Sequence, residues 1–184
     1  MAPVTSSRYP LQINAGFLFG QPVGTGRDIH FDLPQVQITT EFSVSDFSGI
    51  ARLGRTRQGI LVQGDFKANI TVECVRCLGS FTQPLQTCFD ELFAFDKRSA
   101  TESELILPED ANINLAPLLR EYLMLEIPIC PICRVDCLGL CSVCGENLNN
   151  SQCDHSSEYA FPETENTLYR AFMAAQQEGN PLKD

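Results

Sequence analysis

Apolar and polar residues alternate along the first half of the chain with the period of half-buried β-strands. The segments LQINAGFLFG and RDIHFDL show this alternation, and VQITTEFSV continues it on one strand face. That face carries Val36, Ile38, Thr40, Phe42 and Val44. Farther along, ARLGRTRQGILVQGDFKANITVEC predicts two strands joined by a turn near Arg55–Gly59. Their inward-facing candidates are Ile60, Val62, Ile70 and Val72.

A further strand is expected in TQPLQTCFDELFAF, where Cys88 alternates with apolar residues. We interpret Cys88 as a core cysteine, since free cysteines are commonly buried. Consecutive strands joined by short, glycine-containing turns favour an antiparallel meander or a small barrel over a parallel sheet.

Helical spacing replaces the alternation in INLAPLLREYLMLEIP, which predicts a helix over about residues 115–126 that packs on the sheet. Asn114 is the expected N-cap, and Pro128 is the expected stop. A second helix is expected in TENTLYRAFMAAQQ, with an apolar stripe of Leu168, Phe172 and Ala175.

The pattern divides the chain into three parts. We expect an antiparallel β domain over residues 1–95, an exposed connector over 96–112, and a third part over 113–184. The third part holds the first helix, a cysteine-rich segment and the C-terminal helix. The fold class is therefore α+β.

Charge is distributed unevenly along the sequence. The chain has 13 Lys and Arg against 23 Asp and Glu, a net charge of −10, which argues against broad nucleic-acid binding because such binding neutralises phosphates. Residues 51–80 nevertheless carry +3, whereas residues 81–129 carry −6 and residues 130–184 carry −5. Any RNA contact is expected in the first of these ranges, and the acidic remainder suits a basic protein partner. The candidate RNA-binding residues are Arg52, Arg55 and Arg57.

The cellular compartment bears on the chemistry of the cysteines. No apolar run approaches the ~20 residues that span a bilayer, and the start MAPVTSSRYP is not typical of a signal or transit peptide. We therefore expect a cytoplasmic protein with no membrane partner. In a reducing compartment, clustered cysteines favour metal over disulfides, and nine cysteines would leave one unpaired in a disulfide framework.

The CxxC motif occurs three times, as Cys74–Cys77, Cys130–Cys133 and Cys141–Cys144. Two intervening residues allow a tight turn to direct both thiolates at one metal ion, and zinc takes four N or S ligands in a tetrahedron. Glycine follows the third copy and permits the positive φ that closes such a turn. The sequence therefore predicts a compact zinc site. Its ligands are Cys141, Cys144, Cys153 and His155.

The first CxxC pair needs partners, because two thiolates do not complete a tetrahedral site. Cys133 and Cys137 are the best available residues. Two other partitions stay open. In one, Cys130 and Cys133 join the first pair. In the other, one shared zinc uses Cys74, Cys77, Cys141 and Cys144.

Catalytic motifs are not evident. A thioredoxin-like redox pair opens a helix after a strand in a βαβ unit, whereas Cys74 and Cys77 lie in a meander. The sequence also lacks a P-loop, a GxSxG motif and an HExxH motif. We expect no enzyme and no small-molecule substrate. A thiol-redox or nuclease-type enzyme is the alternative.

The chain resembles the YceD family, which is linked to accumulation of large-subunit ribosomal RNA. Four segments carry the resemblance, in the family's order and across nearly all of residues 13–155. They are FLFGQPVGTGRDIHFD, VECVRCLGSF, LLREYLMLEIPICPICRVDC and GLCSVCGENLNNSQCDH. The combination is specific, whereas CxRC or GLCxxCGxNLN alone would not identify a family.

The resemblance assigns the metal motif position by position. The motif falls on Cys74, Cys77, Cys133, Cys137, Cys141, Cys144, Cys153 and His155. It favours two structural Zn²⁺ ions over one shared ion, and Cys130, which departs from the family's pattern, leaves the ligands of the first site less secure. Four protein ligands at a site leave no position at which the metal could activate water.

The resemblance also implies a function. It indicates a non-enzymatic factor in large-subunit biogenesis, with large-subunit rRNA or its precursor as a partner. A second implied partner is a small, basic, zinc-containing protein of the large ribosomal subunit. An adaptor for that protein without any RNA contact is a further alternative.

Overall fold

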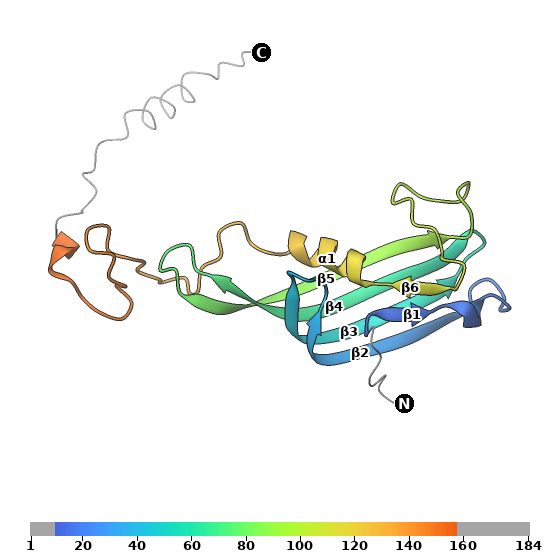
Figure 1. Ribbon diagram of the computed structural model, residues 1–184, viewed down its shortest axis with the longest axis horizontal. Helices are drawn as coiled ribbons and strands as arrows, with labels where there is room; N and C mark the ends of the chain where they lie inside the picture. Colours follow the sequence, from blue (N-terminus) through green and yellow to red (C-terminus); the bar gives the residue numbers. More distant parts are fainter. Residues whose placement is uncertain (1–9, 158–184) are drawn as a thin grey trace, which may run out of the picture. The chain divides into compact units, whose positions relative to one another are not determined.

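The computed structural model describes residues 10–157. Its elements are β1 (Gln12–Asn14), the 3-10 helix η1 (Gly16–Leu18), β2 (Gly26–Gln37), β3 (Ser43–Arg55), β4 (Gly59–Glu73), β5 (Ser80–Ala94), β6 (Asn112–Asn114), α1 (Ala116–Leu125) and the 3-10 helix η2 (Asp154–Ser157). The described residues form two compact units, one of residues 10–75 and 79–133 and the other of residues 76–78 and 134–157. All the strands and α1 belong to the first unit (Figure 1).

The larger sheet is an antiparallel meander. Its strand order is β2-β3-β4-β5, and each strand pairs with its neighbour in sequence. The sheet is open, so the meander is confirmed and the small barrel is not. The expected turn between two strands lies between β3 and β4, where the Thr56 hydroxyl oxygen accepts the backbone N–H of Gly59. A second antiparallel sheet pairs β1 with β6.

One expected strand proved to be a hairpin. The prediction of one strand through VQITTEFSV was wrong, because the chain reverses between β2 and β3. The backbone N–H of Ile38 donates to the carbonyl of Phe42, and the N–H of Phe42 donates to the carbonyl of Thr39. Val36 and Val44 are still both buried, since they pair directly across the hairpin.

Aromatic rings form the centre of the core in the first unit. The ring of Phe66 on β4 stacks on Phe47 at 5.2 Å and on Phe89 at 6.0 Å between centroids. Phe89 in turn stacks on Tyr122 of α1 at 4.9 Å. Gly64 leaves room for this row, because a Cβ there would lie 2.6 Å from the Phe89 ring and 2.7 Å from the Phe66 ring. The rings therefore join three strands and the helix in one packed layer.

The orientation of β5 contradicts the core assignment of Cys88. Cys88 is exposed on the outward face, opposite Asp65 of β4. The inward face of this strand consists of Leu85, Thr87, Phe89, Glu91 and Phe93. Because side chains alternate strictly along a strand, burial of this set places Cys88 on the other face.

Helix α1 lies within one residue of the expected bounds at each end. Its buried side chains are Leu118, Leu119 and Leu123. The Asn114 carboxamide oxygen accepts the backbone N–H of Ala116 at 3.1 Å, although Leu115 occupies the cap position. No helix in the described part of the chain is long and apolar enough to cross a membrane. The helix expected around Leu168, Phe172 and Ala175 lies outside the described residues.

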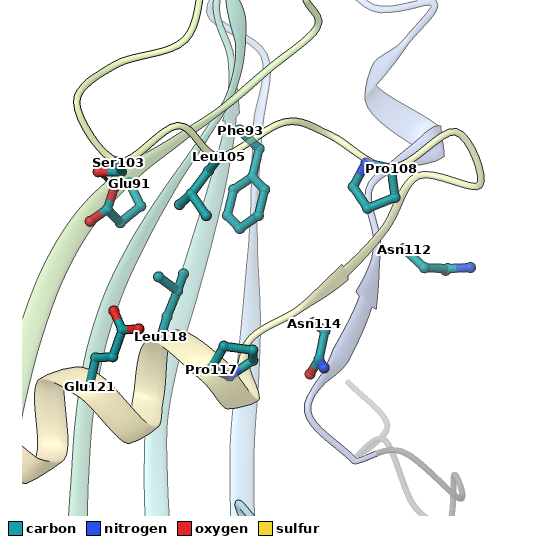
Figure 2. Close-up of a pocket in the computed structure, with 10 residues that line it drawn as sticks. All are labelled: Glu91, Phe93, Ser103, Leu105, Pro108, Asn112, Asn114, Pro117, Leu118 and Glu121. Atoms are coloured by element: carbon teal, nitrogen blue, oxygen red, sulfur yellow. Dashed lines mark hydrogen bonds between the residues drawn. The ribbon is translucent and has the colours of Figure 1, made fainter. Parts of the chain in front are cut away.

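A buried carboxylate also holds α1 on the sheet. Glu91 of β5 is 9% exposed, and its two oxygens accept hydrogen bonds from the hydroxyls of Tyr122 and Ser103, each at 2.7 Å. Glu91 and Ser103 line a pocket of about 450 Å³ beside α1 and β6 (Figure 2). Because both oxygens of Glu91 are occupied, we interpret this carboxylate as structural.

The Glu91–Tyr122 contact predicts a pH dependence of stability. The hydrogen bond to Glu91 is the main cause that raises the pKa of Tyr122 to about 12. The pKa of Tyr122 in the folded state exceeds the unfolded value of about 10. The contribution of this tyrosine to folding stability is therefore present below pH 10 and is lost as the pH rises toward 12. We expect Tyr122→Phe to lower the free energy of unfolding by about 1 kcal/mol below pH 10, a modest value because the tyrosine is partly exposed. Urea unfolding at several pH values measures it.

The same variant provides the control for the alkaline limb. Wild type should lose stability between pH 10 and 12 more steeply than Tyr122→Phe, because only wild type has this phenol to ionise. Parallel curves for the two proteins would show that the hydrogen bond does not contribute to stability.

Candidate metal centres

The first group of potential ligands consists of Cys74, Cys77, Cys133 and Cys137. Their sulfur atoms all lie within 4.8 Å of one another. Cys74 follows the last residue of β4 and is fully buried, and Cys77 and Cys137 are buried as well. Four sulfurs around a zinc ion at about 2.3 Å would lie roughly 3.8 Å apart. The group is therefore compact enough to close on one ion after small side-chain movements.

The second group consists of Cys141, Cys144, Cys153 and His155, again with all ligand atoms within 4.8 Å of one another. The Nδ1 atom of His155 is buried and has no hydrogen-bond partner. A buried imidazole nitrogen without a partner is costly, and a metal ion among the three neighbouring sulfurs would satisfy it. This observation supports the fit of a metal ion to the second group.

The CxxC turns at Cys74–Cys77 and at Cys141–Cys144, here the first and second turns, share one backbone geometry. In the first, the N–H of Cys74 donates to the carbonyl of Gly79 at 2.9 Å. In the second, the N–H of Cys141 donates to the carbonyl of Glu146 at 2.8 Å, which is the same spacing along the chain. The residue after the second cysteine has positive φ in both, 56° at Leu78 and 74° at Gly145. The positive φ predicted after Cys144 is therefore confirmed, and the first turn adopts it without glycine.

The second turn also stabilises a thiolate. The backbone N–H groups of Cys144 and Val143 are the largest cause of a pKa near 6 at Cys141, below the usual thiol value. The pKa of Cys153 is raised, mainly by its hydrogen bond with the Cys141 sulfur. Because cysteine binds metal as the thiolate, this turn is preorganised for ligation.

Polar residues that are not ligands support the first group. The Arg76 guanidinium donates to the carbonyl of Cys137 at 3.1 Å. The carboxamide N–H of Asn149 donates to the Cys137 sulfur at 3.4 Å, and its oxygen accepts the backbone N–H of Leu138 at 2.9 Å. Such contacts orient metal ligands. Asn149 was not predicted from the sequence, although it lies in the segment GLCSVCGENLNNSQCDH.

In the described part of the second unit, no aliphatic or aromatic side chain is fully buried. Its buried residues are Cys77, Cys137, Gly139 and Cys141. By contrast, Val135 is 90% exposed, Leu138 is 67% exposed and Val143 is 49% exposed. Leu140 and Leu148 are half-buried, so hydrophobic burial contributes little here, and cysteines are the fully buried side chains of this described part of the chain.

The structure places the remaining cysteines outside both groups. Cys130 and Cys88 are exposed, and neither belongs to a group of potential ligands in the described residues. The grouping matches the partition that gives Cys133 and Cys137 to the first CxxC pair. It differs from the partition that uses Cys130 and from the single shared site.

The three candidate RNA-binding arginines have different surroundings. Arg52 forms an ion pair with Asp28, with its Nε 2.8 Å from the carboxylate. The guanidinium carbon of Arg55 lies 5.1 Å from the centre of the Phe95 ring, and the Arg55 Nε is buried without a hydrogen-bond partner. Arg57 is exposed in the turn between β3 and β4. Arg55 is the last residue of β3 and Arg57 lies in the turn, whereas Arg52 lies within β3.

Comparison with known proteins places these features in context. Uncharacterized proteins of Mycobacterium tuberculosis and Mycobacterium leprae are 35% and 33% identical to the chain, over 98 and 101 residues. These alignments cover 51% and 53% of the chain but only 47% and 46% of the relatives. The chain thus spans about half the length of the curated relatives it matches. No solved structure matches.

Two further matches carry a description. An Arabidopsis thaliana protein, described as large ribosomal RNA subunit accumulation protein YCED homolog 1, chloroplastic, is 41% identical over 51 residues, which are 28% of this chain and 16% of that protein. The family model described as large ribosomal RNA subunit accumulation protein YceD matches residues 62–165, a range that includes all eight potential metal ligands. Because this match covers more than half of the chain, the chain belongs to the YceD family.

Proposed function

We propose that this protein is a zinc-binding factor that supports the accumulation of large-subunit ribosomal RNA and the biogenesis of the ribosome by binding rather than catalysis. Membership of the YceD family supports the link to ribosomal RNA. The burial of cysteines in place of apolar side chains in the second unit is the observation that supports the metal.

Zinc is the ion that best fits the chemistry of the ligands. Each group offers four sulfur or imidazole atoms, the set and number that structural zinc sites use. A metal ion with four protein ligands has no open position for water, so it acts as a scaffold. The Cys141 thiol, which has the lowered pKa, is only 8% exposed, and this burial argues against a thiol enzyme that attacks external substrates.

The partners follow from charge and family. Large-subunit rRNA is the proposed nucleic-acid partner. The acidic remainder of the chain, with a net charge of −5 over residues 130–184, suits a basic ribosomal protein. In this proposal the metal-bound segments hold the shape of the protein, and the contacts with partners lie on other surfaces.

Metal content is the first test. Protein purified in reducing buffer should carry two zinc ions per chain, one for each group, by elemental analysis. A strong chelator should then abolish hydrogen-exchange protection in the second unit, for example at the amides of Cys141 and Leu148, because structural zinc supplies folding free energy there. The amide of Val62 in β4 should stay protected by the separate core. Full protection at Cys141 and Leu148 after complete zinc removal would contradict the proposal.

Cysteine variants test both the metal and the cellular role. Cys141→Ser should reduce zinc from two ions to one and lower large-subunit rRNA relative to small-subunit rRNA in cells that depend on this protein. Cys88→Ser and Cys130→Ser are matched controls, since both cysteines are exposed and lie outside the ligand groups. They should keep two zinc ions and normal rRNA. Unchanged rRNA in cells that lack the protein altogether would refute the proposed function.

A further inference from the structure

One end of the larger sheet combines exposed aromatic rings with cations. It is the end at which β4 begins and β3 and β5 finish (Figure 1). Backbone hydrogen bonds join its segments, from the N–H of Phe95 to the carbonyl of Gln58 and from the N–H of Gly24 to the carbonyl of Arg55. We call this surface the basic aromatic end, and it consists of Phe19, Arg55, Arg57, Phe95, Lys97 and Arg98.

Its two phenylalanines support each other and remain open to solvent. Phe19 is 45% exposed and Phe95 is 37% exposed. Their ring centroids lie 6.1 Å apart in an edge-to-face arrangement. The guanidinium of Arg55 packs on the Phe95 ring at 5.1 Å. Exposed aromatic surface fixed in this way resembles a platform on which a flat ligand can stack.

The cations around the rings are not neutralised. Arg57, Lys97 and Arg98 are exposed, and none has a salt-bridge partner among residues 10–157. The neighbouring Asp96 accepts the backbone N–H groups of Arg98 and Ser99 and keeps its negative charge. The named residues of this end supply four cations, Arg55, Arg57, Lys97 and Arg98, against the one carboxylate of Asp96, in a chain whose net charge is −10.

We infer that the basic aromatic end binds unpaired RNA, with bases stacked on Phe19 and Phe95 and phosphates held by the surrounding cations. The inference rests on the proposed function and names the surface that performs it. Aromatic faces next to cations are the combination that single strands need, whereas bases in a duplex are already stacked on each other. The acidic remainder of the chain confines RNA to this end.

The assignment differs from a site on Arg52, Arg55 and Arg57. Arg52 donates two hydrogen bonds to the carboxylate of Asp28, at 2.8 and 3.1 Å, so its charge is already compensated. Arg55 and Arg57 remain in the site. Lys97 and Arg98 join them from the segment after β5, which lies outside the basic stretch of residues 51–80.

The test uses the full-length, zinc-loaded protein and a labelled oligouridine of about twelve nucleotides, with binding followed by fluorescence anisotropy at several salt concentrations. Phe19→Ala should weaken binding roughly five- to hundred-fold, the usual effect of losing one stacked base. Phe19→Leu should lose as much, because it keeps apolar bulk but has no ring face, whereas Phe19→Trp should bind at least as well as wild type.

The charge arm uses the triple variant Arg57→Ala, Lys97→Ala and Arg98→Ala. Its slope of log affinity against log salt should be shallower by about 2, since each phosphate contact on a single strand contributes about 0.7. Lys67→Ala removes an exposed cation eight residues along β4 from Gly59 and is the matched control. Lys67→Ala and Arg52→Ala should both bind nearly as wild type does.

Several results would overturn the inference. The first is that the wild-type protein does not bind oligouridine, and the second is that Lys67→Ala and the triple variant lose affinity equally. The others are that Phe19→Leu keeps wild-type affinity, or that the protein binds a duplex or a polyglutamate peptide more tightly than oligouridine. Failure of the proposed function is a separate result, namely normal rRNA in cells without the protein. If rRNA is reduced in those cells but oligouridine binding is unchanged in the Phe19 variants and in the triple variant, only the assignment to this surface is rejected.

Discussion

The central constraint on this molecule is that the described part of its second unit fully buries no aliphatic or aromatic side chain. Among residues 76–78 and 134–157, the buried positions are three cysteines and one glycine, while Val135 and Leu138 face solvent. With so little hydrophobic burial, these described residues gain little free energy to offset the loss of conformational entropy on folding. Ligation of a divalent metal supplies free energy on the scale of about 10 kcal/mol per site. In the proposed function, ligation of a metal ion by the clustered cysteines supplies the free energy that holds this local fold.

The first unit contrasts with this arrangement because it has an ordinary core. Phe47, Phe66 and Phe89 stack through the inner face of the meander, and Tyr122 continues the row into α1. Glu91 adds a polar contact that fixes the helix over the strands. The first unit is held by its hydrophobic core, whereas in the second unit the CxxC turns bring cysteines together as potential metal ligands.

The sequence predicted those features that depend on local pattern. Alternation and helical spacing identified the meander and α1, and the repeated CxxC identified the turns. Features set by tertiary contacts were not predictable. The turn at Thr39–Phe42 has no glycine or proline to mark it, and the face of Cys88 depends on the burial of Thr87 and Glu91 against their usual preference. The ion pair of Arg52 likewise joins positions on different strands.

Zinc-edge X-ray absorption of the purified protein is the most direct test of the central claim, because it reports the ligands of the bound metal. Seven cysteines and one histidine form the two groups, so the account predicts seven sulfur neighbours for each imidazole nitrogen. Those sulfurs should lie at about 2.3 Å and the nitrogen at about 2.0 to 2.1 Å. A first shell dominated by oxygen, or a metal other than zinc at full occupancy, would contradict the claim.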